Sequence, residues 1–81
     1  MRETILTLYI RQDCHLCEEM RAELEPWRAR LGFDLQVIDI AADPALIARY
    51  GDKVPVLARG EREICHYFLD ESALQNCLKG L

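Results

Sequence analysis

The spacing of apolar residues along the chain predicts short strands and helices in alternation. Residues 4–10, TILTLYI, form a continuous apolar run that is typical of a strand buried on both faces of a sheet. Later apolar residues recur every three or four positions, as in an amphipathic helix. They are Leu16, Met20, Leu24, Trp27 and Leu31. Pro26 is expected to kink this helix or end it early, and Gly32 is expected to close it.

A second strand and a short helix are expected in the middle of the chain. Residues 34–41, DLQVIDIA, return to an apolar, β-rich composition after a long connection, so we expect a strand parallel to the first. A helix is then expected over residues 45–50. Asp43 and Pro44 are suited to its N-cap and first position, and Gly51 to its end.

The last third of the chain predicts a hairpin followed by a helix. Residues 53–59 and 62–68 are apolar runs on either side of Gly60, which suits two strands joined by a turn. Asp70 is expected to cap a final helix, whose apolar stripe is Leu74, Cys77, Leu78 and Leu81. The predicted order is β-α-β-α-β-β-α, which one α/β domain over residues 1–81 accommodates.

Composition and charge narrow the classes of function. The chain has 81 residues, of which 51% are hydrophobic and 30% are charged, as in an ordinary globular domain. Its formal net charge of -4 argues against binding to nucleic acid, which relies on clustered Lys and Arg. The apolar run ending at Ile10 is too short for a signal peptide or a membrane span, so a cytoplasmic protein with no membrane contact is expected.

The pair Cys14 and Cys17, in the segment CHLC, lies where the first helix is predicted to begin. Unpaired N–H groups and the helix dipole stabilise a thiolate at such a position, so Cys14 is expected to be acidic and nucleophilic. Cys17, one helical turn later, could then resolve a mixed disulfide formed at Cys14. His15 could stabilise the thiolate as an imidazolium, or it could simply face solvent.

Other uses of the cysteines remain open at this point. A zinc site would need two further ligands, and Cys65 and His66 are adjacent in sequence, unlike most zinc-binding pairs. We therefore expect no metal site, although a metal-bound or an inert CxxC pair is an alternative. Cys65 and Cys77 are expected to be core residues. His66 and Tyr67 could be packing residues or site residues.

Pro55 lies inside the predicted third strand, where a proline would remove a ladder hydrogen bond. Only about 5–6% of X–Pro bonds are cis, so the residues alone do not establish a cis Val54–Pro55 bond. A cis proline beside the thiols would nevertheless turn the preceding backbone toward an incoming peptide, which could then pair with it as an added strand.

The succession of a strand, CHLC at a helix start, VIDI on a second strand, and VP before a hairpin resembles the thioredoxin fold in its minimal, glutaredoxin-like form. The resemblance covers essentially the whole chain and implies a four-stranded mixed sheet. It implies that Cys14 is the nucleophile and Cys17 the resolving cysteine. It further implies that Arg11 meets a glutathione carboxylate and that Val54 contacts glutathione through its backbone, next to a cis Pro55.

The chain also departs from the glutaredoxin pattern. Cys65 and His66 stand where glutaredoxins carry two glycines that leave room for the γ-glutamyl end of glutathione, and Asp70 is near the family's acidic position. CHLC with HY downstream resembles a branch of small bacterial glutaredoxin-like proteins. Asp13 should oppose thiolate formation at Cys14 unless its charge is used to cap the helix.

These observations predict a monomeric thiol–disulfide oxidoreductase that acts on a protein or a glutathione-mixed disulfide. Glutathione is expected at most as a weakly bound co-substrate, and no other cofactor is expected. The expected site residues are Cys14 and Cys17 for catalysis, and Arg11, His15, Val54, Pro55 and His66 for substrate binding. The alternative is a redox-inert binding module that uses the Val54–Pro55 edge, or a protein that holds a metal or an iron–sulfur cluster on the CxxC pair.

Overall fold

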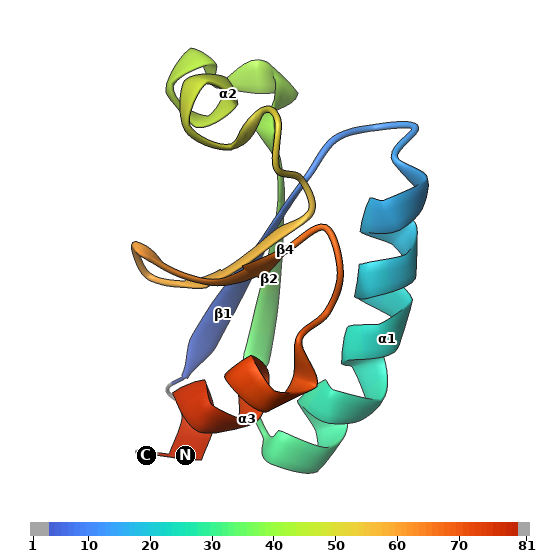
Figure 1. The fold of residues 1–81 in the computed structure, drawn as a ribbon, viewed down its shortest axis with the longest axis vertical. Coiled ribbons are helices and arrows are strands. Elements are labelled where there is room, and N and C mark those ends of the chain that lie inside the picture. The colour runs from blue at the N-terminus through green and yellow to red at the C-terminus, as the bar shows by residue number, and fades with distance from the viewer. Residues whose placement is uncertain (1–3, 80–81) are drawn as a thin grey trace.

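The computed structural model describes residues 4–79 and contains a four-stranded mixed sheet in the order β2-β1-β3-β4 (Figure 1). The strands are β1 (Ile5–Ile10), β2 (Asp34–Asp39), β3 (Val56–Arg59) and β4 (Arg62–His66). The helices are α1 (His15–Leu31), the 3-10 helix η1 (Ile40–Ala42), α2 (Pro44–Tyr50) and α3 (Glu71–Lys79). The predicted order and the α/β class with a thioredoxin-like sheet are confirmed.

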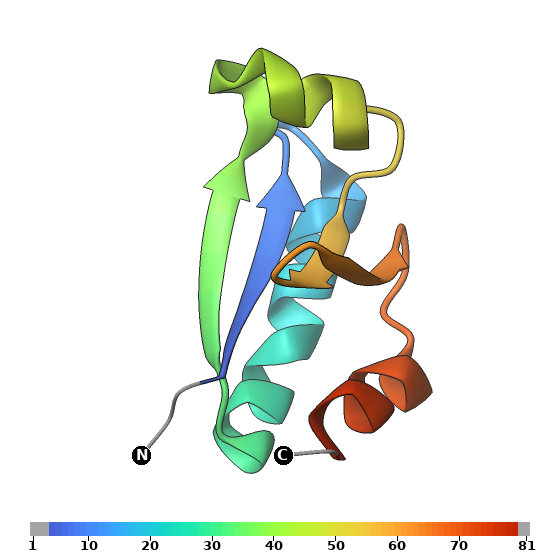
Figure 2. The same ribbon diagram turned by 90° about the vertical axis from the view of Figure 1, so that its left-hand side faces the viewer.

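The strand directions follow from the connections between them. Strands β1 and β2 run parallel, with Ile5 opposite Asp34, and α1 makes the crossover between them (Figure 2). Strand β3 is antiparallel to β1 and to β4. Gly60 lies in the turn between β3 and β4 with a φ of 62°, a left-handed conformation that glycine adopts without steric cost.

The two faces of the sheet carry separate cores because neighbouring strand residues point to opposite sides. The larger core lies between the sheet and helices α1 and α3. Its buried members are Leu6, Leu8, Met20, Leu24, Phe33, Leu57, Cys65 and Leu74. The smaller core lies beneath α2, where Ile40, Tyr50 and Val56 are buried. Helix α2 lies at the end of the sheet where β1 and β2 finish (Figure 2).

Helix α1 continues through Pro26 to Leu31, so of the two expected outcomes, a kink or an early end, the early end was wrong. Proline costs a helix about 3 kcal/mol in its interior, partly through one lost hydrogen bond. Buried Leu24 and half-buried Trp27 pack against the core on either side of Pro26, and that burial offsets the cost. Gly32 ends the helix in the left-handed conformation, as predicted.

Three strands end earlier or start later than their apolar runs suggest. Strand β2 stops at Asp39, whose carboxylate accepts a hydrogen bond from the Ala41 amide and caps η1. Strand β3 starts only at Val56, because Pro55 has no N–H to give to a ladder. Strand β4 stops at His66, since the next residue has a positive φ.

The predicted helix caps are present in the structure. Asp43 accepts a hydrogen bond from the Ala45 amide at the start of α2, and Gly51 is the C-cap of that helix. The Asp70 carboxylate accepts from the Ala73 amide in the first turn of α3. Leu81, the last residue of the predicted α3 stripe, lies outside the described residues.

Candidate redox site

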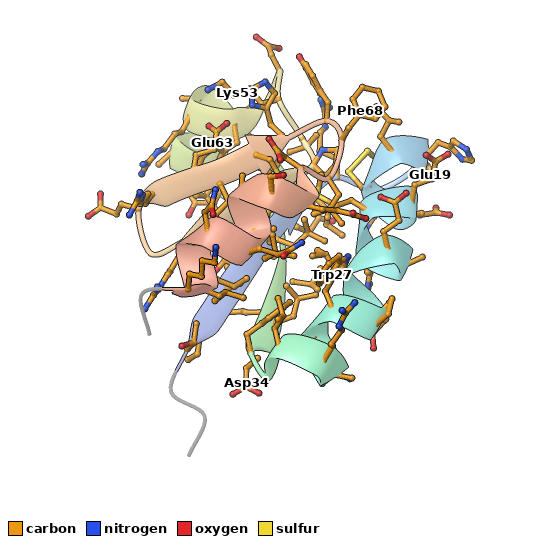
Figure 3. The ribbon with its side chains drawn as sticks, turned by 60° about the horizontal axis from the view of Figure 1, so that its bottom comes forward. Glu19, Trp27, Asp34, Lys53, Glu63 and Phe68 are labelled. Carbon is orange, nitrogen blue, oxygen red and sulfur yellow. A yellow bond between two sulfur atoms is a disulfide. The ribbon has the colours of Figure 1, made fainter. Side chains whose placement is uncertain are left out.

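Cys14 is the N-cap of α1, and this position determines its surroundings. Its Sγ accepts a hydrogen bond from the Cys17 amide at 3.1 Å. The two cysteines form a disulfide, with a Cα–Cα distance of 5.2 Å (Figure 3). Cys14 is half-buried, whereas Cys17 is only 2% exposed. Cys14 therefore carries the more accessible sulfur of the pair, the outer sulfur, and Cys17 carries the inner one.

Three of the predicted site residues line one cavity at this end of the sheet. Arg11, Cys14 and Val54 surround a hollow of about 350 Å³, together with Gln12 and Asp13. Arg11 comes from the loop after β1, and Val54 comes from the loop after α2, so segments distant in sequence meet beside the outer sulfur. The arrangement brings a basic residue and the residue before Pro55 into one hollow with the more accessible cysteine.

Tyr67, which from the sequence could be a packing residue or a site residue, bonds to the loop that carries Val54. The Val54–Pro55 peptide bond is cis, and Pro55 is fully buried behind Val54. The Tyr67 amide donates a hydrogen bond to the Pro55 carbonyl at 2.9 Å, and its hydroxyl donates to the Asp52 carbonyl. One residue thus contacts the loop on both sides of Val54.

A second connection joins the same loop to β4. The side chains of Lys53 and Glu63 lie close together (Figure 3), with the Lys53 Nζ 3.2 Å from Glu63 Oε1. The other Glu63 oxygen contacts His66 Nδ1. Hydrogen bonding to His66 lowers the pKa of Glu63, and Lys53 lowers it further, although burial acts in the opposite direction.

A bulge in β4 makes the contact between Glu63 and His66 geometrically possible. Residues three apart in a regular strand point to opposite faces. Cys65 pairs with Leu57 and Glu63 with Ala58, so the pairing skips Ile64. This extra residue lets Glu63 and His66 lie on the same side of the strand.

Two predicted site residues lie away from the cavity beside Cys14. His15 is on the exposed side of α1, where its side chain pairs with Glu19 at 2.7 Å. His66 lines a different and larger hollow of about 710 Å³ together with Cys65 and Phe68. Phe68 is 67% exposed, which makes it the most exposed of the large apolar side chains in the described part of the chain.

The two remaining cysteines are free thiols in different surroundings. Cys65 is buried in the larger core, as expected, and burial raises its pKa. Cys77 is only half-buried on α3, and its carbonyl accepts a hydrogen bond from Arg59 at 3.0 Å. The expectation that it belongs to the core is therefore met only in part.

Asp13 does not act as the helix cap. The cap is Cys14, and Asp13 precedes it with a φ of 56°, in the left-handed region that aspartate tolerates better than most residues. The Asp13 side chain is exposed and lines the cavity beside Cys14. Asp13 therefore shares this cavity with Cys14 without capping the helix.

Within residues 4–79, no group of three or more His, Cys, Asp and Glu side chains is arranged to hold a metal ion. The helices of the same range include none with the length and apolar character of a membrane span.

The sheet topology and the CxxC pair at a helix start define a protein of the thioredoxin-fold class. Residues 5–79 match the family model of the glutaredoxin-like domain (DUF836), and the chain belongs to this family. Related proteins of Mycobacterium tuberculosis and Mycobacterium bovis are 32% identical over 73 residues, which cover 84% of this chain and 75% of theirs.

Solved structures support the same assignment. A Nitrosomonas europaea protein, determined in solution by NMR, is 42% identical with a TM-score of 0.84, over 95% of this chain and 93% of that one. An X. campestris protein, determined by X-ray crystallography, is 38% identical with a TM-score of 0.70, over 94% and 97% of the two chains. Thioredoxin 1 of Thermosipho africanus, at 20% identity and a TM-score of 0.63, shares the fold.

Proposed function

We propose that the protein is a thiol–disulfide oxidoreductase that reduces a protein disulfide or a mixed disulfide in a reducing compartment such as the cytoplasm. The Cys14 thiolate attacks one substrate sulfur, a new S–S bond forms, and the substrate S–S bond breaks to release a thiolate that takes a proton from water. Cys17 then gives up its proton and attacks the Cys14 Sγ, which releases the second substrate sulfur as a thiol. Two electrons pass to the substrate, and the Cys14–Cys17 disulfide remains.

The observation that carries this proposal is the position of Cys14 as the N-cap of α1. The Cys17 amide already points at the Cys14 sulfur, and in the reduced protein the same N–H would stabilise a thiolate through a charge-assisted hydrogen bond. The helix dipole acts in the same direction. The exposure of Cys14 and the burial of Cys17 suit the roles of nucleophile and resolving cysteine.

Substrate orientation is assigned to the residues that share the cavity with Cys14. Arg11 can bind a carboxylate or a carbonyl of the substrate, and the Val54 main chain can pair with an extended segment. Pro55 supports Val54 from within the protein. We assign His15 and His66 no direct contact with the reacting sulfurs, because they lie outside this cavity.

The proposal is tested by measuring the alkylation rate of Cys14 against pH in a reduced Cys17→Ser variant. The midpoint should lie below the free-cysteine value of about 8.5. Cys77 in the same sample provides an internal reference, because mass spectrometry of separate peptides reports both thiols. A Cys14 midpoint at or above that of free cysteine would count against the enzyme.

A second candidate is a redox-inert binding module, and the observation in its favour is Asp13. Its carboxylate lines the Cys14 cavity without acting as the helix cap, so it opposes thiolate formation there. In this case the Val54–Pro55 edge would hold a partner, and the cysteines would be inert or bound to a metal. Native mass spectrometry distinguishes the two: retained zinc or an iron–sulfur cluster favours the module, and reversible loss of two hydrogens favours the enzyme.

A further inference from the structure

Tyr67 contacts both ends of the loop segment that presents Val54 to the redox site. Its hydroxyl bonds the Asp52 carbonyl, and its amide bonds the Pro55 carbonyl. The residues between these two contacts include Val54, which shares a cavity with Cys14. Tyr67 itself is absent from the residues that line this cavity, so it acts on the cavity through the loop.

The backbone of Tyr67 is adapted to these contacts. Its φ is 66°, in the left-handed region that an aromatic residue rarely occupies. Such a conformation persists only where surrounding interactions hold it. The two hydrogen bonds to the loop are interactions of this kind, and the edge-to-face contact of its ring with His66 is a third.

The hydroxyl contact belongs to the surface and not to the core. Tyr67 is 41% exposed, and Asp52, whose carbonyl it binds, is an exposed residue. Water can therefore replace the hydroxyl when it is removed, and no buried polar group is left unpaired. Loss of this hydroxyl should loosen the conformation of the loop and have little effect on the stability of the fold.

We propose that Tyr67 is a positioning residue, which holds the Val54 main chain in the orientation that an extended disulfide-containing polypeptide pairs with. This inference rests on the proposed function and names the substrate class to which the residue matters. The binding of a polypeptide that pairs with the main chain at Val54 depends on the conformation of the loop, whereas the reaction of a small disulfide that meets only the Cys14 sulfur does not. The Tyr67 hydroxyl should therefore lower the polypeptide concentration needed for half-saturation and leave the rate of attack by Cys14 unchanged.

The experiment compares wild type, Tyr67→Phe and Tyr9→Phe in single-turnover reduction by the pre-reduced protein, without an external reductant. Tyr9→Phe is the matched control, since it removes a hydroxyl from a ring that stacks on Tyr50. One substrate is a short peptide with an internal disulfide, at varied concentration. The other is 5,5′-dithiobis(2-nitrobenzoate), a small disulfide with no main chain.

For Tyr67→Phe, the half-saturating peptide concentration should rise about twofold to tenfold, the effect of one net hydrogen bond. Its maximal rate, its rate with the aromatic disulfide and its melting temperature should stay close to those of the wild type. Tyr9→Phe should match the wild type in all four.

Two results would overturn the inference while the proposed function stands. One is equal half-saturation by the peptide in Tyr67→Phe and Tyr9→Phe. The other is equal slowing of both substrates in Tyr67→Phe, which would indicate an effect on Cys14 itself. A wild-type protein that reduces neither substrate would instead overturn the proposed function, and the inference with it.

Discussion

The redox site has two sides that are built differently. The α1 side consists of Cys14 and Cys17 at the start of that helix, and the β4 side consists of Glu63, Cys65, His66 and Tyr67 on and just after that strand. On the α1 side, the chemistry depends on local geometry: Cys14 and Cys17 are one turn apart at the start of a helix, and the hydrogen bond between them spans three residues. On the β4 side, the contacts join distant segments, as when Tyr67 bonds Asp52 across 15 positions. The first side carries the sulfurs of the CxxC pair, and the second contacts the loop that lines the same cavity as Cys14.

This difference also separates what the chain shares with glutaredoxins from what it does not. The α1 side keeps the CxxC pair and the preceding Arg11. The resemblance to glutaredoxins implies that Cys65, which is buried in the core, and His66, which contacts Glu63, stand where glutaredoxins carry two glycines. Reactivity toward disulfides and choice of disulfide should therefore be separable by mutation, one side at a time.

The largest effect is expected on the α1 side. Cys14→Ser should abolish disulfide reduction, because the accessible sulfur that attacks the substrate is gone. Cys17→Ser should keep the first step and accumulate a protein–substrate mixed disulfide, since no resolving thiol remains. Intact-mass measurement after mixing with a peptide disulfide distinguishes the two variants. Equal trapping by both would show that the assigned order of attack is wrong.

A smaller but still large effect is expected for glutathione on the β4 side. The resemblance to glutaredoxins implies that Cys65 and His66 stand where that family accepts the γ-glutamyl end of glutathione, so their side chains should crowd this end. An unpaired polar group there would cost about 1–3 kcal/mol, or roughly 5- to 150-fold in affinity. The wild type should therefore turn over glutathione-mixed disulfides poorly. A double variant, Cys65→Gly with His66→Gly, should recover part of that turnover.

The glutathione prediction needs a control for folding, because Cys65 is part of the core. His66→Gly alone removes an exposed side chain that contacts Glu63 and Tyr67 but not the core, so it should recover some activity with a smaller loss of stability than the double variant. Circular dichroism on each variant checks the fold. If the wild type is already as fast as an ordinary glutaredoxin, the steric argument is wrong.

A moderate difference is expected between the two free thiols. Burial raises the pKa of Cys65, so at neutral pH less of it is thiolate, and its sulfur is also shielded from reagents. Cys77 is half-buried on α3 and should be alkylated severalfold faster. Timed alkylation of the native reduced protein, followed by peptide mass spectrometry, measures both. Faster labelling of Cys65 would mean that the β4 side opens in solution.

The sequence predicted the features that depend on local residue patterns better than those that depend on contacts between distant segments. The helix start at Cys14, the parallel crossover and the caps at Gly32 and Asp43 come from local patterns, and the structure agrees with them. The contact between Glu63 and His66 was not predictable, because it depends on a bulge that shifts the register of β4. The two hydrogen bonds of Tyr67 to the loop were not predictable either, because they depend on a loop conformation that no periodicity encodes.

The smallest effect is expected for the ion pairs of Glu63 on the β4 side. Bonding to His66 lowers the pKa of Glu63 in the folded protein, so the carboxylate stabilises the fold above its unfolded pKa of about 4.5 and loses this effect as the pH falls through the folded value. Glu63 is partly exposed, and the contribution should be about 0.5 kcal/mol.

Glu63→Gln should therefore lower the free energy of unfolding at pH 6 and have little effect at pH 3. Urea denaturation at both pH values measures the difference, with Glu61→Gln, a 95% exposed side chain, as the matched control. An equal loss at both pH values would show that Glu63 acts through packing, and its connection to Lys53 and His66 would then contribute no charge-dependent stability to the loop beside Cys14.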